Sequence, residues 1–176
     1  AVELGIVFVE RGEVAWAESW LVHPGCRIDG FSQSIHGIGD RDVVAAPSFP
    51  AVWAEVRPRL DGAVLLAHNA PFDSRVLQAE ETRHGLAPGN PVWWCTLRLA
   101  RRLWKGRYSS FRLAYLGDAL QLEARSCHRG LGDAHAALDL FRVEARHACQ
   151  LGYRELAELE PLACSGRGRP RIARKA

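Results

Sequence analysis

The chain has 176 residues, of which 48% are hydrophobic and 24% charged, and this composition excludes both a disordered and a membrane-spanning protein. Its length predicts a single domain with a full hydrophobic core. Five cysteines without a CxxC pair favour reduced thiols in a cytoplasmic protein over disulfides or a zinc site. The net charge of +3 comes from the end of the chain, because removing the five basic residues after Ser165 leaves 18 basic residues against 20 acidic ones.

The first third of the chain predicts a strand hairpin followed by a helix. Residues 1–9 form a β-branched apolar run, a turn containing glycine follows, and residues 14–22 form a second strand. Residues 25–46 show no periodicity, so we expect them to be irregular. Ser48 is placed to cap a helix over 49–61.

The remaining elements predict an α/β domain. Residues 63–67 are wholly apolar and lead directly into a helix, a pattern typical of a strand buried on both faces of a sheet. Apolar residues at helical spacing predict the last helix over 132–150, with its charges on the outer face. We further expect a strand over 92–96, a terminal helical segment over 151–164, a disordered basic tail over 165–176, and helices over 73–83, 97–104 and 110–121.

Two stretches carry candidate chemistry, and each places a histidine five residues before an aspartate at an expected helix start. They are His68-Asn69-Ala70-Pro71-Phe72-Asp73 and His128-Arg129-Gly130-Leu131-Gly132-Asp133. Carboxylates at such junctions suit hard divalent cations, which take oxygen ligands and keep several waters. A histidine beside them is suited to deprotonate a water near neutral pH.

Each stretch also has a purely structural interpretation. Asn69 and Asp73 are residue types that cap helices, and His68 fits a turn. Asp133 would likewise cap the long helix, after a loop made flexible by Gly130 and Gly132. A histidine five residues before an aspartate is common by chance, so neither stretch is specific by itself.

The order of the motifs is more specific than either motif. A strand hairpin, Ile35-His36-Gly37-Ile38, His68…Asp73 and His128…Asp133 succeed one another over about residues 1–150. This succession resembles the DnaQ-like (DEDDh) 3′–5′ exonucleases, in particular the exonuclease domain of the DNA polymerase III epsilon subunit. Val2-Glu3-Leu4-Gly5 and Gly132-Asp133-Ala134 extend the similarity.

The resemblance implies a ribonuclease H-like three-layer α/β fold with a mixed central sheet, and two-metal hydrolysis of a 3′-terminal phosphodiester. By the resemblance, Asp73 and Asp133 are ligands of Mg²⁺ or Mn²⁺, and His128 is the base that activates water. His68, Asn69 and Phe72 would shape the substrate site, and His36 is a weaker contact candidate. The implied partner is DNA with a single-stranded 3′ end, an RNA substrate stays open, and so does assembly with a DNA polymerase subunit. No membrane partner is implied.

One family motif is absent from this sequence. The first motif, an Asp-x-Glu on the strand preceding Ala1, is missing, and Glu3 matches a later glutamate of the pattern. Two of four carboxylates are then lacking, which predicts an inactive or nearly inactive chain without its first central strand. Because the sequence also lacks methionine and begins inside a strand, we expect a truncated start. The alternative is a catalytically inactive nucleic-acid-binding or polymerase-associated module of the same fold.

The tail carries a separate signal. Arg167, Arg169 and Arg171 stand in Gly-Arg-Gly-Arg-Pro-Arg, which resembles an AT-hook that lies in the minor groove of A·T-rich DNA. The simpler alternative is a basic tail that binds phosphates without reading the sequence. Either interpretation places nucleic acid near this end.

Overall fold

The computed structural model describes residues 1–124 and 128–164, so the expected basic tail lies outside the described residues. The strands are β1 (Glu3–Glu10), β2 (Glu13–Leu21), β3 (Val64–Ala67) and β4 (Val92–Cys95). The longer helices are α3 (Phe49–Leu60), α4 (Ala70–Arg83), α5 (Thr96–Leu103), α6 (Leu113–Ala119) and α7 (Gly130–Gln150). Short helical turns complete the chain: α1 (Gly30–His36), α2 (Asp40–Val43), η1 (Leu156–Leu159) and α8 (Glu160–Ala163).

The hairpin predicted at the start of the chain is confirmed. β1 pairs antiparallel with β2 from Glu3 opposite Leu21 to Glu10 opposite Glu13, with one irregularity after Phe8. The turn between the strands places Arg11 and Gly12 at φ 53° and 89°. Two successive positive φ values match the right-handed twist of the flanking strands, so they close the hairpin tightly.

The second sheet is parallel, because α4 carries the chain from β3 back to the start of β4. Val64 pairs with Val92, and the register continues to Ala67 and Cys95. The expectation that β3 is buried on both faces is wrong, since Val64 is 42% exposed and the rest of β3 is half-buried. Among the described residues β1 pairs only with β2 and β3 only with β4, so each has an edge without a strand partner.

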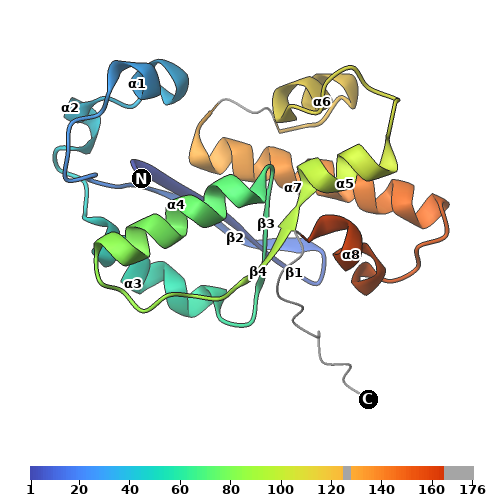
Figure 1. The fold of residues 1–176 in the computed structure, drawn as a ribbon, viewed down its shortest axis with the longest axis horizontal. Coiled ribbons are helices and arrows are strands. Elements are labelled where there is room, and N and C mark those ends of the chain that lie inside the picture. Colours follow the sequence, from blue (N-terminus) through green and yellow to red (C-terminus); the bar gives the residue numbers. More distant parts are fainter. Residues whose placement is uncertain (125–127, 165–176) are drawn as a thin grey trace.

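Helices cover the two sheets in layers (Figure 1). On one side, side chains of β1 and β2 pack against Phe49, Val52 and Trp53 of α3, and Leu77 of α4 joins them. On the other side, Trp94 of β4 belongs to an apolar cluster with residues of α5, α7 and α8. No helix within 1–124 and 128–164 has the length and apolarity needed to cross a membrane.

A cavity of about 520 Å³ lies among α3, α4 and the first residues of β3 and β4. Trp53, Leu65 and Leu77 are among its lining side chains, whereas none of the predicted site residues lines it. The cavity is therefore a gap in the packing beside β3 and is separate from the candidate chemistry.

The expectation that residues 25–46 are irregular is wrong, because α1 and α2 lie within them. Asp29 caps α1 by accepting a hydrogen bond from the Ser32 N–H at 2.9 Å, and Gly37 ends it at φ 73°. The caps stabilise a helix that buries none of its own residues, so no hydrophobic periodicity was available to reveal it.

We expected the charged residues of the last helix to lie on its outer face. This expectation is wrong for Glu144 of α7, which is fully buried. Burial raises the pKa of the Glu144 carboxyl well above its ordinary range, Cys95 adds to the rise, and the Ala100 backbone offsets a part. Burial therefore favours the neutral, protonated form of the Glu144 carboxyl.

Candidate active site

Asp73 and Asp133 occupy the same position in two different helices. Each is the fourth residue of its helix, α4 and α7 respectively, and therefore lies in the first turn. In Figure 1 both helices begin below and between α1 and α6, which form the upper edge of the view. Backbone N–H groups at a helix start carry partial positive charge, which favours carboxylates there.

The two carboxylates interact electrostatically. Burial raises the pKa of Asp73 to about 6, a hydrogen bond to its own backbone offsets part of the rise, and the negative charge of Asp133 adds to it. Asp73 is half-buried, so solvent screens this repulsion incompletely. The pair is thus a concentration of negative charge that a cation would relieve.

His128 precedes α7 in an exposed position, with the left-handed backbone angle φ 56°. Its backbone N–H donates to Oδ1 of Asp133 at 3.2 Å. The loop that carries the imidazole is therefore bonded directly to one of the two carboxylates. Residues 125–127, just before it, lie outside the described residues.

Glu3 is a site residue whose role the sequence did not reveal. Its carboxylate accepts from the Gly130 N–H at 2.7 Å and from Arg129 at 3.0–3.3 Å, so it joins β1 to the start of α7. Burial acts to raise the pKa of Glu3, but the hydrogen bonds from Arg129 and Gly130 outweigh it, and the pKa lies below its ordinary value. Because this contact spans 127 positions in the chain, no local pattern could have predicted it.

A close approach of two backbones supports the same junction. A Cβ atom added to Gly5 of β1 would lie 2.1 Å from the carbonyl carbon of Gly130. Only glycine fits at such a separation. Gly5 therefore allows α7 to begin directly against β1, which sets the position of Asp133.

His68 follows β3, and both of its ring nitrogens are bonded within the protein. Nε2 lies 2.9 Å from the Phe111 carbonyl and must donate to it, so Nδ1 accepts from the Thr96 hydroxyl at 2.9 Å. Burial lowers the pKa of His68, and the positive charge of Arg101 lowers it further, against the Phe111 bond and Asp133. His68 is accordingly a neutral link between β3, α5 and the segment before α6.

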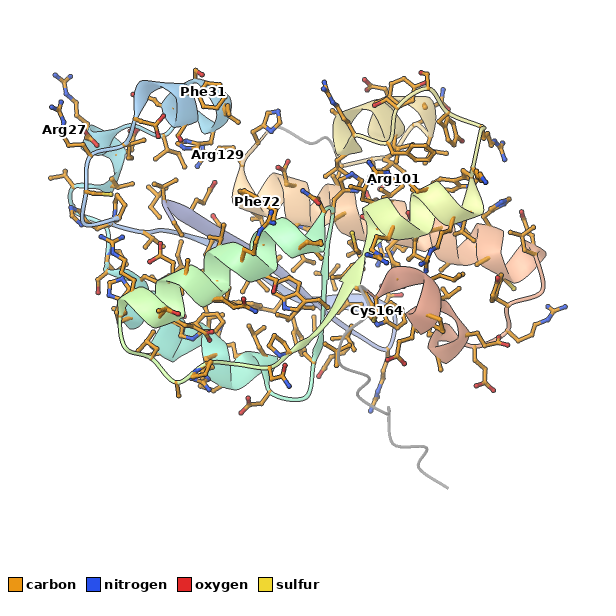
Figure 2. The ribbon with its side chains drawn as sticks, in the orientation of Figure 1. Arg27, Phe31, Phe72, Arg101, Arg129 and Cys164 are labelled. Atoms are coloured by element: carbon orange, nitrogen blue, oxygen red, sulfur yellow. The ribbon has the colours of Figure 1, made fainter. Side chains whose placement is uncertain are left out.

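The remaining predicted residues surround the two carboxylates. Asn69 stands at the N-cap of α4 at φ 70°, a conformation that asparagine tolerates better than most residues. Phe72 is 56% exposed beside Asp73, and Figure 2 shows it and Arg129 on the same side of the molecule. His36 ends α1, and a positive charge on its ring lowers the pKa of Glu3, which places it near β1.

The donor set suits one divalent cation better than two. Within the described ranges, no three His, Cys, Asp or Glu side chains form a group that could hold a metal ion. Mg²⁺ is commonly bound by one or two carboxylates, with waters and substrate phosphates completing its shell, and Asp73 with Asp133 meets that need. A two-ion site requires further oxygen ligands.

Comparisons with known proteins agree with this geometry. The family model described as exonuclease, of the RNase_T type, matches residues 1–141. The chain is 28% identical over 162 residues to the 3′-5′ exonuclease DinG of Bacillus subtilis, which covers 92% of this chain and 17% of that protein. It is 29% identical over 154 residues to the DNA polymerase III subunit epsilon of Treponema pallidum, covering 86% of this chain and 72% of the subunit.

A solved structure of Exonuclease X in complex with 5′ overhanging duplex DNA matches with a TM-score of 0.67 and 28% identity, covering 90% of each chain. The chain spans between 11% and 24% of the length of the first three curated relatives that it matches. The family model covers most of the chain, and the fold and motif order agree with it. The chain therefore belongs to the exonuclease family of the RNase_T type, in agreement with the predicted DnaQ-like resemblance, and it has the expected ribonuclease H-like fold.

Proposed function

We propose that this chain is a 3′–5′ exonuclease domain that removes nucleotides from single-stranded 3′ ends of DNA. The observation that carries the proposal is the electrostatic coupling of Asp73 and Asp133 in the first turns of α4 and α7. The 3′-5′ exonuclease name of the Bacillus relative and the DNA bound to Exonuclease X support this direction and substrate. A DNA-processing role would place the chain in the cytoplasm.

Asp73 and Asp133 would hold Mg²⁺ or Mn²⁺ through carboxylate oxygens. The ion, when bound, supplies stabilisation of negative charge on the scissile phosphate. His128 accepts a proton from the attacking water on a ring nitrogen, and its exposed loop lets it approach a bound strand. A new bond forms between the water oxygen and phosphorus, the bond from phosphorus to the 3′ oxygen breaks, and that oxygen takes up a proton.

The other predicted residues would position the strand. Phe72, largely exposed beside Asp73, offers an aromatic face to the terminal base, and His36 approaches from α1. Asn69 would hold the start of α4 in its left-handed turn. His68 would act indirectly, because its two ring bonds fix the segment containing Phe111 against β3 and α5.

The described site is incomplete for a two-ion reaction. We infer that a further strand, bearing carboxylates and lying between the unpartnered edges of β1 and β3, supplies the missing ligands. The 176-residue chain alone would then cleave slowly or not at all. Two observations support this inference: β1 and β3 each have an edge without a strand partner among the described residues, and Asp73 and Asp133 supply too few carboxylates for two ions. The absence of the first central strand stays a prediction.

The alternative function is a non-catalytic nucleic-acid-binding module, associated with a polymerase as the epsilon relative's name suggests. The small donor set favours it. For the first proposal, the alternative substrate is RNA. The proposed domain division, with the exonuclease domain over 1–150, a helical segment over 151–164 and a basic tail over 165–176, serves either function. Contacts of Arg167, Arg169 and Arg171 with DNA fall outside the described residues.

The direct test is digestion of a 3′-labelled single-stranded oligonucleotide in Mn²⁺. The chain is compared with a form extended upstream in the reading frame, and Asp133→Asn and Asp61→Asn are made in the extended form. We expect the extended form to release mononucleotides from the 3′ end, Asp133→Asn to lose at least about 100-fold of the rate, and the exposed Asp61→Asn to retain it. DNA binding without cleavage in either form would replace the proposal with the non-catalytic alternative.

A further inference from the structure

A cationic segment lies next to the candidate active site. The sequence from 82 to 117 contains no aspartate or glutamate, and the part from Arg98 to Arg112 holds six lysine and arginine residues. Such a segment repels other cations and attracts anions, unless nearby carboxylates neutralise it.

Two of these arginines face away from the site and have structural roles. Arg102 donates through Nη1 to the carbonyl of Pro161 in α8. Arg98 lies close enough to Cys164 for its charge to lower the pKa of that thiol, against burial and Glu160, which raise it. Both side chains therefore belong to the packing of α5 against α8.

The other cations are exposed on the remaining surface of α5 and of its connection to α6. Arg101 projects from the side of α5 that faces α6, whereas Cys164 lies on the opposite side of α5 (Figure 2). Lys105 and Arg112 are also exposed, and the Arg107 guanidinium stands 5.7 Å from the centre of the Tyr108 ring. In the described part of the chain, ion pairs with carboxylates form at other arginines, namely Arg27, Arg59, Arg129 and Arg142.

This surface is fixed to the active site by His68. The carbonyl of Phe111, the residue before Arg112, is bonded to Nε2 of His68 at 2.9 Å. The charge of Arg101 also acts on the His68 ring. The charge of Asp133 acts on the same ring, so Arg101 lies near the two-carboxylate site.

We propose that the exposed cations Arg101, Lys105, Arg107 and Arg112 bind successive phosphates of the nucleic-acid strand whose 3′ end occupies the site. This inference rests on the proposed function and adds the path of the strand beyond the terminal nucleotide. It is a binding surface, distinct from the residues that would act on the scissile bond.

The chemistry favours a nucleic acid over an acidic protein. Three of the four cations are arginines, whose planar guanidinium matches a phosphate with two parallel hydrogen bonds. Tyr108 and Phe111 lie between the cations in sequence, and their half-buried rings pack against the cluster around Trp104, which holds this segment in place. The surface also adjoins a site whose family members cleave nucleic-acid ends.

The test measures the salt dependence of oligothymidylate binding by fluorescence anisotropy, in EDTA so that no cleavage occurs. Each phosphate contact on a single strand contributes about 0.7 to the slope of log K against log salt, so Arg101→Gln/Arg107→Gln/Arg112→Gln should reduce the slope by about 2. Affinity near 0.1 M salt should fall on the order of 10–100-fold. The tail is present in every protein compared, so its contribution cancels.

Two matched triple variants control for charge and folding. Arg101→Lys/Arg107→Lys/Arg112→Lys keeps the charge and should keep the slope. Arg11→Gln/Arg57→Gln/Arg59→Gln removes three charges from the hairpin turn and α3, outside the proposed surface, and should also keep the slope. An unchanged slope in Arg101→Gln/Arg107→Gln/Arg112→Gln, or an equal loss in Arg11→Gln/Arg57→Gln/Arg59→Gln, would overturn the proposal.

The outcomes separate the two proposals. If the Arg→Gln triple variant loses salt dependence but neither the chain nor its extended form cleaves DNA, the phosphate-binding surface stands and the exonuclease assignment falls. If DNA is cleaved from its 3′ end and the Arg→Gln triple variant keeps its salt dependence, the exonuclease assignment stands and the phosphate-binding surface falls. Displacement of the oligonucleotide by polyglutamate of equal charge would show an unselective anion surface and would also overturn the strand path.

Discussion

The carboxyl group of Asp73 is half-buried and interacts with the negative charge of Asp133. Its pKa of about 6 in the folded chain lies above the ordinary value of 3.8. The folded state therefore binds this proton more tightly than the unfolded state does. The free energy of unfolding should rise as the pH falls through about 6 toward about 4, because only in the folded protein does protonation remove a buried charge and its repulsion from Asp133.

Replacing Asp73 by asparagine should remove this pH dependence. The variant Asp73→Asn should unfold with a free energy about 1–3 kcal/mol higher than the parent near neutral pH, and should match it more closely near pH 4. Urea unfolding followed by circular dichroism across this pH range measures the effect. Asp61→Asn, at an exposed helix end, is the matched control and should leave the dependence unchanged. An Asp73→Asn protein with the parent's pH dependence would show that Asp73 does not have a raised pKa in the folded chain.

At this scale the sequence could propose candidate site residues but could not predict all of their contacts. Asp73 and Asp133 were identifiable because each lies a few residues from a helix start, and short-range spacing fixes that position. The role of Glu3 was not identifiable, because its partner Gly130 lies 127 positions away in the sequence. The neutral state of His68 was equally hidden, because it depends on Phe111, 43 positions away.

Among the elements, the contact of β1 with the start of α7 determines the site. Gly5 lies so close to Gly130 that any side chain must displace one backbone from the other. The same contact carries the hydrogen bonds of Glu3 to the first residues of α7. The position of Asp133 therefore depends on a strand that supplies none of the reacting groups.

The variant Gly5→Ala should destabilise the protein by about 2–4 kcal/mol, because the added carbon overlaps backbone that has no flexible side chain to move aside. Thermal or urea unfolding measures the loss. Gly117→Ala in α6 is the control: nothing lies within 4 Å of its added carbon, and the change should stabilise the helix by about 0.5–1 kcal/mol. Equal stability of Gly5→Ala and the parent would contradict the close packing.

Element types were predictable where hydrophobic periodicity or a turn signal was present, as in the β1–β2 hairpin and α7. The starts were less accurate: α4 begins at Ala70 and α7 at Gly130, both earlier than expected. The helix α1 was not predicted for a different reason: it is stabilised by its caps and buries none of its residues. The prediction that β3 is buried on both faces was also wrong, because burial depends on neighbouring elements that a local sequence pattern does not contain.

Across the whole molecule, two sheets with helices on both sides bring opposite charges to one edge. Carboxylates of α4 and α7 lie at the helix starts, and the cations of α5 and of the segment before α6 adjoin them. Such an arrangement suits a cation held by acids and a polyanion held by arginines. The open edges of β1 and β3 lie within the same layers, where a further strand would complete the sheet.

Manganese binding tests the central claim most directly, because it requires neither substrate nor a completed site. Titration of the 176-residue chain followed by electron paramagnetic resonance should detect one Mn²⁺ bound near neutral pH. Asp73→Asn and Asp133→Asn should each weaken binding by about tenfold or more, while Asp61→Asn should bind as the parent does. Binding of equal strength in all four proteins, or no binding in the parent, would contradict the assignment of Asp73 and Asp133 as a divalent-cation site.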